Sequence, residues 1–333
     1  GGRVLAGTGR GSGPAPALPA AAVPAPPLPE GADPPVDGLT PYATPVGDFY
    51  RIDTAFWNVP DVSAQQWRLR ISGLVGREVE VSYADVLAMP LVERWITLTC
   101  VSNEVGGPYA GTARWLGVPL ADLLRRAAPT AAADMLLARS VDGFTTSTPL
   151  ADVLDGRDAL LAVGMDGAAL PREHGFPARM VVPGLYGYVS ACKWVTEIEV
   201  TRFDRAAAYW TERGWAERAP VRTASRIDVP RSEATVRAGT AVAVAGVAWA
   251  QRRGIRRVEV RLDDGPWQEA QVLPAVSADT WVQWLWRWPR AAAGEHVLQV
   301  RATDGTGAVQ DAEQRPPEPD GATGYHAITV TAA

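Results

Sequence analysis

Residues 98–117 read LTCVSNEVGGPYAGTARWLG and place one of the chain's two cysteines at the end of an apolar run, directly before a loop. Alternation puts Ile96, Leu98 and Cys100 on one face of the segment that leads into this loop. A period of two predicts a strand that ends at Cys100. A thiol at such a junction is either a small buried hydrophobe or a ligand or nucleophile presented to a cleft. Spacing alone favours the buried hydrophobe, so other motifs have to decide.

Length and composition limit the class of protein. The chain has 333 residues, 47% of them hydrophobic, and this length predicts two domains. Its 32 basic and 37 acidic residues give a formal net charge of -5, without a dense Lys/Arg cluster, so we expect no nucleic-acid partner. No apolar run reaches the roughly 18 residues typical of a membrane span. Its two cysteines lack metal-type spacing, and no pattern supports a disulfide between Cys100 and Cys192.

The sequence divides into three parts. Residues 1–40 are rich in Pro, Ala and Gly and predict an extended linker that buries no core. Residues 41–218 mix strand and helix patterns without regular βαβ spacing, which predicts an α+β domain. Residues 219–333 contain alternating runs separated by Gly, Asp and Pro turns, which predict an all-β immunoglobulin-like sandwich.

Finer patterns predict individual elements. Residues 67–73 and 78–83 predict a strand pair, and Ser82 with Asp85 has the spacing of a capping box at the start of a short helix. Residues 149–154 predict another helix, with Thr148 as its N-cap. A Trp cluster in the third part is expected to lie in the core or at a domain interface. Its members are Trp281, Trp284, Trp286 and Trp288.

The N-terminal part also carries an expectation about location. The chain begins with Gly rather than Met, and a linker composition follows. We therefore expect a processed product that was once joined to a signal, an anchor or a membrane domain, with an extracytoplasmic location.

Three separated motifs carry a family resemblance. Residues 171–194 read PREHGFPARMVVPGLYGYVSACKW, and they combine with CVSN at 100–103 and TARWLGVPLADLL at 112–124. In their order along the chain, these three motifs resemble the molybdopterin-binding domain of the sulfite oxidase family. The predicted sandwich lies where that family has its dimerisation domain, so the resemblance covers roughly residues 45–330 and implies a homodimer.

The resemblance implies a molybdenum-molybdopterin cofactor and a role for each matching residue. Cys100, in the C-x-x-N motif with Asn103, is implied to be the protein's single ligand to molybdenum. A soft thiolate suits a metal that pterin sulfurs already bind. His174 could otherwise be an ordinary loop histidine, and Arg179 a surface ion pair, but their joint spacing favours pterin binding. The full set implied to contact the cofactor is Tyr50, Arg51, Asn103, Ser140, Asp142, His174, Arg179, Ala191, Cys192 and Lys193.

Two departures from the family concern the substrate. Sulfite-oxidising members carry an arginine five residues after the ligand cysteine, where this chain has Val105, and a tyrosine where Trp215 stands. Sulfite is a small dianion that needs cationic partners. A catalytic pocket lined by Val105, Tyr109 and Trp215 would be more apolar, which favours a neutral sulfoxide or N-oxide over sulfite.

The sequence therefore predicts a molybdopterin-dependent oxidoreductase that carries out two-electron oxygen-atom transfer on a small-molecule oxygen donor or acceptor. Only three histidines are present, none in a haem-binding pattern, so a separate electron-transfer partner is expected, either a cytochrome or a membrane subunit. The alternative is an exported, non-catalytic binding or scaffold protein with an immunoglobulin-like module. Intact Cys100, His174 and Arg179 favour the enzyme, because a scaffold needs none of them.

Overall fold

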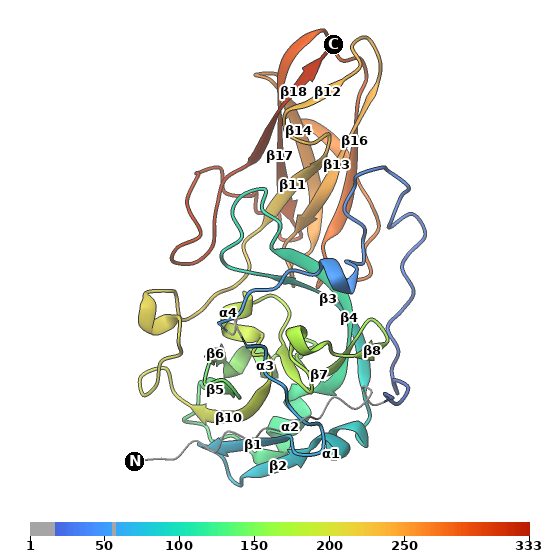
Figure 1. The fold of residues 1–333 in the computed structure, drawn as a ribbon. Helices are drawn as coiled ribbons and strands as arrows, with labels where there is room; N and C mark the ends of the chain where they lie inside the picture. The colour runs from blue at the N-terminus through green and yellow to red at the C-terminus, as the bar shows by residue number, and fades with distance from the viewer. Residues whose placement is uncertain (1–16, 55–57) are drawn as a thin grey trace.

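A computed structural model describes residues 17–54 and 58–333, and these form two parts stacked along one axis (Figure 1). The lower part in this view holds strands β1 to β10 with the helices, and the upper part holds strands β11 to β18. Within the described residues, every helix is too short or too polar to cross a membrane.

Two sheets build the lower, α+β part, as predicted. The first has the order β2-β1-β10-β5-β6, with β1 and β10 parallel and the other neighbours antiparallel. The second has the order β3-β4-β7-β8, with β9 paired to β7. Side chains of β1 alternate between buried and exposed, whereas β7 is buried on both faces, as a covered central strand requires. The strands are Arg68–Gly73 (β1), Val79–Ser82 (β2), Val92–Thr99 (β3), Ala110–Pro119 (β4), Met135–Ser140 (β5), Thr145–Pro149 (β6), Leu160–Met165 (β7), Ala168–Ala169 (β8), Arg179–Val181 (β9) and Val195–Thr201 (β10).

Short helices connect these strands. The predicted capping box starts α1, where Ser82 Oγ accepts the Asp85 N–H at 3.1 Å and the Asp85 carboxylate accepts the Ser82 N–H at 2.8 Å. The predicted N-cap Thr148 does not cap α3, which follows Pro149, because its hydroxyl donates to the Val189 carbonyl instead. The helices are Tyr83–Leu87 (α1), Leu120–Ala127 (α2), Leu150–Leu154 (α3) and Gly187–Ser190 (α4), with 3-10 turns at Val46–Asp48 (η1), Arg172–His174 (η2) and Thr211–Arg213 (η3).

The upper part is all-β. Its strands follow one path in the order β11-β13-β16-β15-β14-β17-β18-β12, antiparallel except for the β12/β18 pair. Trp284, Trp286 and Trp288 on β16 are buried in its core, and Trp281 packs into the core of the α+β part, so the prediction of a core and interface cluster is confirmed. The more specific immunoglobulin-like assignment stays a prediction. The strands are Ala224–Val229 (β11), Ala234–Val236 (β12), Val242–Trp249 (β13), Ile255–Leu262 (β14), Gln268–Val272 (β15), Val282–Trp288 (β16), Gly294–Asp304 (β17) and His326–Ala332 (β18).

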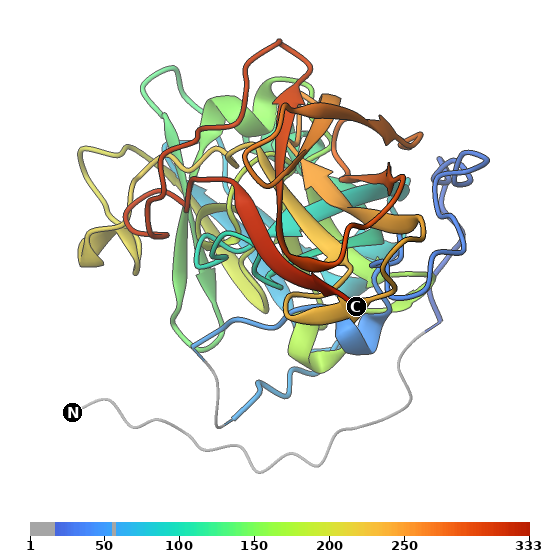
Figure 2. The same cartoon turned by 90° about the horizontal axis from the view of Figure 1, so that it is seen from above.

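Residues 17–40 differ from the predicted linker, whose first 16 residues lie outside the described part. This blue segment runs along one side of both parts (Figure 1 and Figure 2). The Trp95 indole donates to the Pro26 carbonyl at 3.0 Å, and the Gln283 amide donates to Asp33 Oδ1 at 2.9 Å. An extended Pro-rich chain leaves its carbonyls free to accept such donors. The segment is therefore a strap fixed to both parts rather than a free linker.

Candidate functional site

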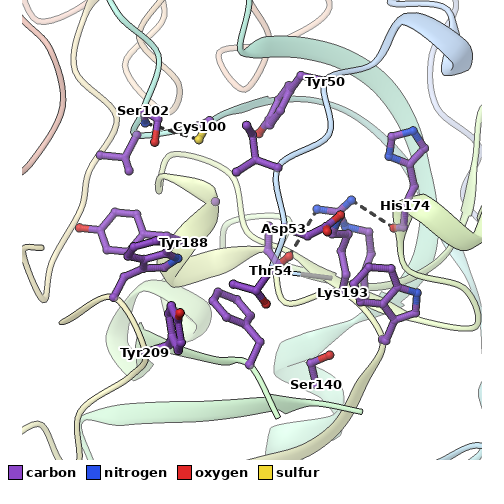
Figure 3. Close-up of a pocket in the computed structure, with 18 of the residues that line it drawn as sticks. Tyr50, Asp53, Thr54, Cys100, Ser102, Ser140, His174, Tyr188, Lys193 and Tyr209 are labelled. Atoms are coloured by element: carbon purple, nitrogen blue, oxygen red, sulfur yellow. Dashed lines mark hydrogen bonds and ion pairs between the residues drawn. The ribbon is translucent and has the colours of Figure 1, made fainter. Parts of the chain in front are cut away.

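A cavity of about 430 Å³ lies where strands of both α+β sheets end. Cys100 follows β3, Ser140 ends β5 and Arg179 begins β9. His174 comes from η2 (Figure 3). This size is typical of small-molecule sites, which span about 300–1,000 Å³. Of the sequence-predicted residues, those that line the cavity are Tyr50, Cys100, Ser140, Asp142, His174, Arg179, Ala191, Lys193 and Trp215.

The thiol of Cys100 reaches the cavity wall although its residue is only 9% exposed. The Ser102 N–H donates to Sγ at 3.4 Å, and the Cys100 N–H donates to the Tyr109 carbonyl at 2.9 Å. Burial raises the pKa of Cys100, which the Ser102 contact only partly offsets. Both cysteines are free thiols. The strand end therefore holds Cys100 as an isolated soft donor facing a cavity.

The loop after Ser102 turns away from the cavity, and this corrects the expected place of two residues. Val105 and Asn103 line a separate cavity of about 20 Å³ near Trp249, so Val105 forms no wall of the main cavity. Asn103 Oδ1 accepts the Tyr109 N–H at 2.7 Å, which closes the loop on itself. Tyr109 is likewise absent from the cavity lining.

The second part of the molecule supports this loop. Arg226 Nη1 donates to the Gly107 carbonyl at 2.9 Å. His326 packs against Gly106, where an added Cβ would lie 2.4 Å from the imidazole. Gly106 also has a φ of 77°, a conformation that favours glycine. The loop that carries Cys100 is thus clamped by β11 and β18.

Arg179 is a buried cation without a carboxylate partner among the described residues. Its residue is 6% exposed, and its guanidinium donates to the carbonyls of His174 at 3.2 Å and of Ala191 at 3.4 Å. Burial lowers the pKa of Arg179 to about 10. A buried charge without a counter-charge is costly unless an anionic ligand pairs with it. The geometry therefore favours an anionic ligand in this cavity.

Lys193 meets an acidic residue that the sequence did not single out. Its Nζ lies 2.6 Å from Asp53 Oδ2, and the Arg51 Nε lies 2.8 Å from the same oxygen. Burial lowers the pKa of Lys193 to about 8, although Asp53 opposes this shift. Burial raises the pKa of Asp53, but the hydrogen bonds from Arg51 and Lys193 outweigh it and lower that pKa overall. Arg51, a predicted cofactor contact, stays outside the cavity lining.

His174 is held as a neutral imidazole. Burial, followed by the positive charges of Arg179 and Lys193, lowers the pKa of His174 to about 4. Its ring packs edge-on against Phe49 with centroids 5.7 Å apart. Neutral imidazole offers one donor and one acceptor. It therefore suits the heterocyclic edge of a ligand better than a phosphate.

Two predicted cofactor contacts, Ser140 and Cys192, differ in whether they can reach a ligand in the cavity. Ser140 Oγ is buried without a hydrogen-bond partner in the described part of the chain, although it lies at the cavity. Cys192 is fully buried outside the cavity lining, and burial raises its pKa to about 12.

Among the described residues, no three His, Cys, Asp or Glu side chains gather as a metal site. A metal at Cys100 would thus need ligands from a cofactor. The soft thiol, the unpaired Arg179 and the orphan hydroxyl of Ser140 fit a cofactor of that kind that also carries a phosphate.

An aromatic wall faces the cationic wall across the cavity, with Tyr188 and Tyr209 on the opposite side from His174 and Lys193 (Figure 3). Its rings come from α4 and from two loops, at 141–144 and 202–218. Only Trp215 was predicted, because the other rings gave no spacing signal beyond the adjacent Tyr209 and Trp210. The wall consists of Phe144, Tyr188, Tyr209, Trp210 and Trp215.

The sequence is similar to a known family of domains and to known proteins. The family described as the oxidoreductase molybdopterin binding domain matches residues 56–210. Mitochondrial sulfite oxidase of Homo sapiens is 31% identical over 320 residues, covering 82% of this chain and 58% of that protein. An uncharacterized oxidoreductase, YuiH of Bacillus subtilis (strain 168), is 33% identical over 154 residues, covering 45% of this chain and 72% of that protein. The chain therefore spans little more than half of the human relative.

A solved structure resembles almost the whole chain. The sulfane dehydrogenase SoxCD from Paracoccus pantotrophus superposes with a TM-score of 0.76 at 25% sequence identity. The match covers 88% of this chain and 82% of that chain, so it includes both the α+β part and most of the all-β part.

Proposed function

Because this chain belongs to the sulfite oxidase family of molybdopterin-binding oxidoreductases, we propose that it catalyses two-electron oxygen-atom transfer in the cavity beside Cys100. The observation that carries the proposal is an isolated soft thiol in the same cavity as Arg179, a buried cation that has no carboxylate partner among the described residues. A molybdenum-molybdopterin cofactor satisfies both, since its metal accepts a thiolate and its phosphate is an anion.

Each residue then has a distinct task. Cys100 ligates the metal and holds it at a fixed strand end. Arg179 and Lys193 pair with the phosphate, while His174 and Ser140 hydrogen-bond the pterin. When bound, the cofactor supplies a metal centre that exchanges one oxygen atom and two electrons with a substrate.

The substrate that the cavity supports best is neutral, a sulfoxide or an N-oxide rather than sulfite. The two cations that line the cavity, Arg179 and Lys193, are assigned to the phosphate, and Arg51 does not line the cavity. The opposite wall is formed by aromatic rings, with the carboxylate of Asp142 beside them. A dianion without cationic partners loses charge-assisted hydrogen bonds worth about 1.5–3 kcal/mol each. This support comes from the aromatic lining rather than from Val105, which lies outside the cavity.

The test uses protein purified from a host that makes molybdopterin. About one molybdenum per chain is expected by metal analysis, with poor sulfite oxidation and faster reduction of a neutral oxide by a reduced viologen. Efficient sulfite oxidation would overturn the substrate assignment, and metal-free protein from a competent host would favour the non-catalytic scaffold. Further parts of the proposal are an extracytoplasmic location, a separate electron-transfer partner, and an immunoglobulin-like second domain that forms a homodimer.

A further inference from the structure

The aromatic wall is a continuous row of rings rather than a scattered set. Ring centroids are 5.9 Å apart for Tyr188 and Trp215, and 6.3 Å apart for Trp215 and Trp210. The row continues through Tyr209, 5.0 Å from Trp210, to Phe144, 5.6 Å from Tyr209. All five side chains are half-buried, so each keeps surface for a ligand.

One ring of the wall already has a cation on its face outside the cavity. The guanidinium carbon of Arg213 lies 3.6 Å from the centroid of Tyr209, although Arg213 is exposed and does not line the cavity. Arg213 also donates to the Tyr209 carbonyl at 2.6 Å. Aromatic faces bind such cations through the ring quadrupole, best when the ring is Trp. Trp210 and Trp215 offer stronger faces of the same kind.

A carboxylate stands beside the row. Asp142 lines the cavity from the same turn as Phe144, whose N–H donates to Asp142 Oδ1 at 3.2 Å. It has no ion-pair partner among the described side chains. The cations that line the cavity, Lys193 with Arg179, are assigned to the phosphate. The aromatic side of the cavity is therefore electron-rich and acidic.

We infer that this wall binds an onium group and that the substrate is the N-oxide of a tertiary amine, an inference that rests on the proposed function. An N-oxide nitrogen carries a formal positive charge and alkyl groups that suit aromatic faces. Its oxygen then points from the wall toward the Cys100 side. Sulfite, a dianion, is repelled by Asp142 and by the ring faces. A sulfoxide sulfur is also positive in its S+–O- form, but it carries only two alkyl groups and a lone pair, so it offers the rings less cationic surface and should bind less tightly.

The reaction balances as a two-electron reduction. The N–O bond breaks, and the oxygen takes two protons and leaves as water. Two equivalents of a one-electron reductant, such as a reduced viologen, supply the electrons, and the nitrogen keeps its lone pair as a tertiary amine. At neutral pH this amine takes up another proton, so the product is also a cation suited to the wall.

A binding experiment separates charge from shape. Choline and its neutral carbon isostere 3,3-dimethylbutan-1-ol are titrated into the purified chain by calorimetry. We expect choline to bind about tenfold more tightly. Equal binding of the two, or tighter binding of the alcohol, would overturn the inference.

Variants locate the effect. Trp215→Leu should bring the choline preference close to one. Asp142→Asn removes the charge but keeps an oxygen that can accept the Phe144 N–H, so it should weaken choline about threefold while leaving the alcohol unchanged. The matched control is Trp267→Leu, because Trp267 contacts Arg261 and Arg301 on the all-β part and does not line the cavity. A choline preference that survives both Trp215→Leu and Asp142→Asn would count against the wall.

Turnover distinguishes this inference from the proposed function. With a reduced viologen, trimethylamine N-oxide should turn over faster than dimethyl sulfoxide, and choline should inhibit competitively. A molybdenum-loaded enzyme that shows no choline preference and favours the sulfoxide would leave the proposed function intact and refute the onium site. A choline preference in a chain that never binds molybdenum would refute the proposed function and the N-oxide substrate with it, but would leave the onium site standing.

Discussion

Replacing Asp53 by asparagine should strongly destabilise the cofactor-free protein, although the two side chains have nearly the same size. Asp53 and Lys193 have side chains only 5% and 9% exposed, and their charged atoms are 2.6 Å apart. Removing one partner of a buried pair typically costs about 3–5 kcal/mol, because the other charge stays buried and unpaired. We expect about 3 kcal/mol, the low end, because Lys193 can also escape by losing its proton.

The pH dependence of this loss follows from Lys193. Burial lowers its folded-state pKa from 10.5 to about 8, and Asp53 limits the shift, so Asp53→Asn lowers that pKa further. Below the folded pKa the lysine is charged and needs its partner. Above about 8 it is neutral in both proteins, so the difference in unfolding free energy should grow as the pH falls below 8, be large at pH 6.5 and be mostly lost by pH 9.5.

Urea unfolding at these two pH values measures the effect. The matched control is Glu78→Gln, which breaks the exposed Arg70–Glu78 pair, with side chains 51% and 58% exposed, and should leave stability nearly unchanged. Adding Lys193→Met to Asp53→Asn should recover much of the loss. In cofactor-loaded protein the loss should shrink, because Lys193 then pairs with the phosphate. An unchanged stability at pH 6.5, or an equal loss at pH 9.5, would refute the reasoning.

Four further expectations follow from the site and the fold. Cys100→Ser should alter the electron paramagnetic resonance spectrum of the loaded protein and abolish turnover, whereas an unchanged spectrum would exclude Cys100 as the ligand. Arg179→Ala should give folded protein that metal analysis shows to be poor in molybdenum, and global unfolding would instead indicate a purely structural role. For His174, a folded pKa of about 4 against 6.5 unfolded means that stability falls by up to about 3 kcal/mol as the pH drops from 6.5 to 4, and His174→Gln should flatten this fall in denaturant curves. Limited proteolysis should cut within 211–218, but the fragments should co-elute on a sizing column, because Trp281 packs into the other part's core; separation of the fragments would contradict this.

Much of the fold could be predicted, because local patterns and global packing agree. The capping box at Ser82 and Asp85 depends on neighbours three residues apart and needed no tertiary information. Trp284 and its neighbours alternate at the period of a strand, so their burial followed from the pattern. The strap at 17–40 escaped prediction, since composition shows that a segment cannot form its own core but not that it packs against another.

The site was predictable where motifs carry it and not where loops do. Cys100, His174 and Arg179 converge on one cavity from separated motifs. Val105 did not, because a position counted along the chain says nothing about the direction in which a loop turns. Asp53 was missed for a similar reason, since its meeting with Lys193 joins positions 140 residues apart.

The clamp on the Cys100 loop restricts how such proteins can recombine. Arg226 and His326 belong to the all-β part, yet they contact Gly107 and Gly106 in the loop after the thiol. In a chimera that takes its α+β part from this chain and its all-β part from a relative, the loop after Cys100 would face residues other than Arg226 and His326 and could lose these contacts. The two parts therefore evolve as one unit. Exchange of the all-β part between relatives should give a stable site only where the residues that contact the loop are exchanged together with their partners.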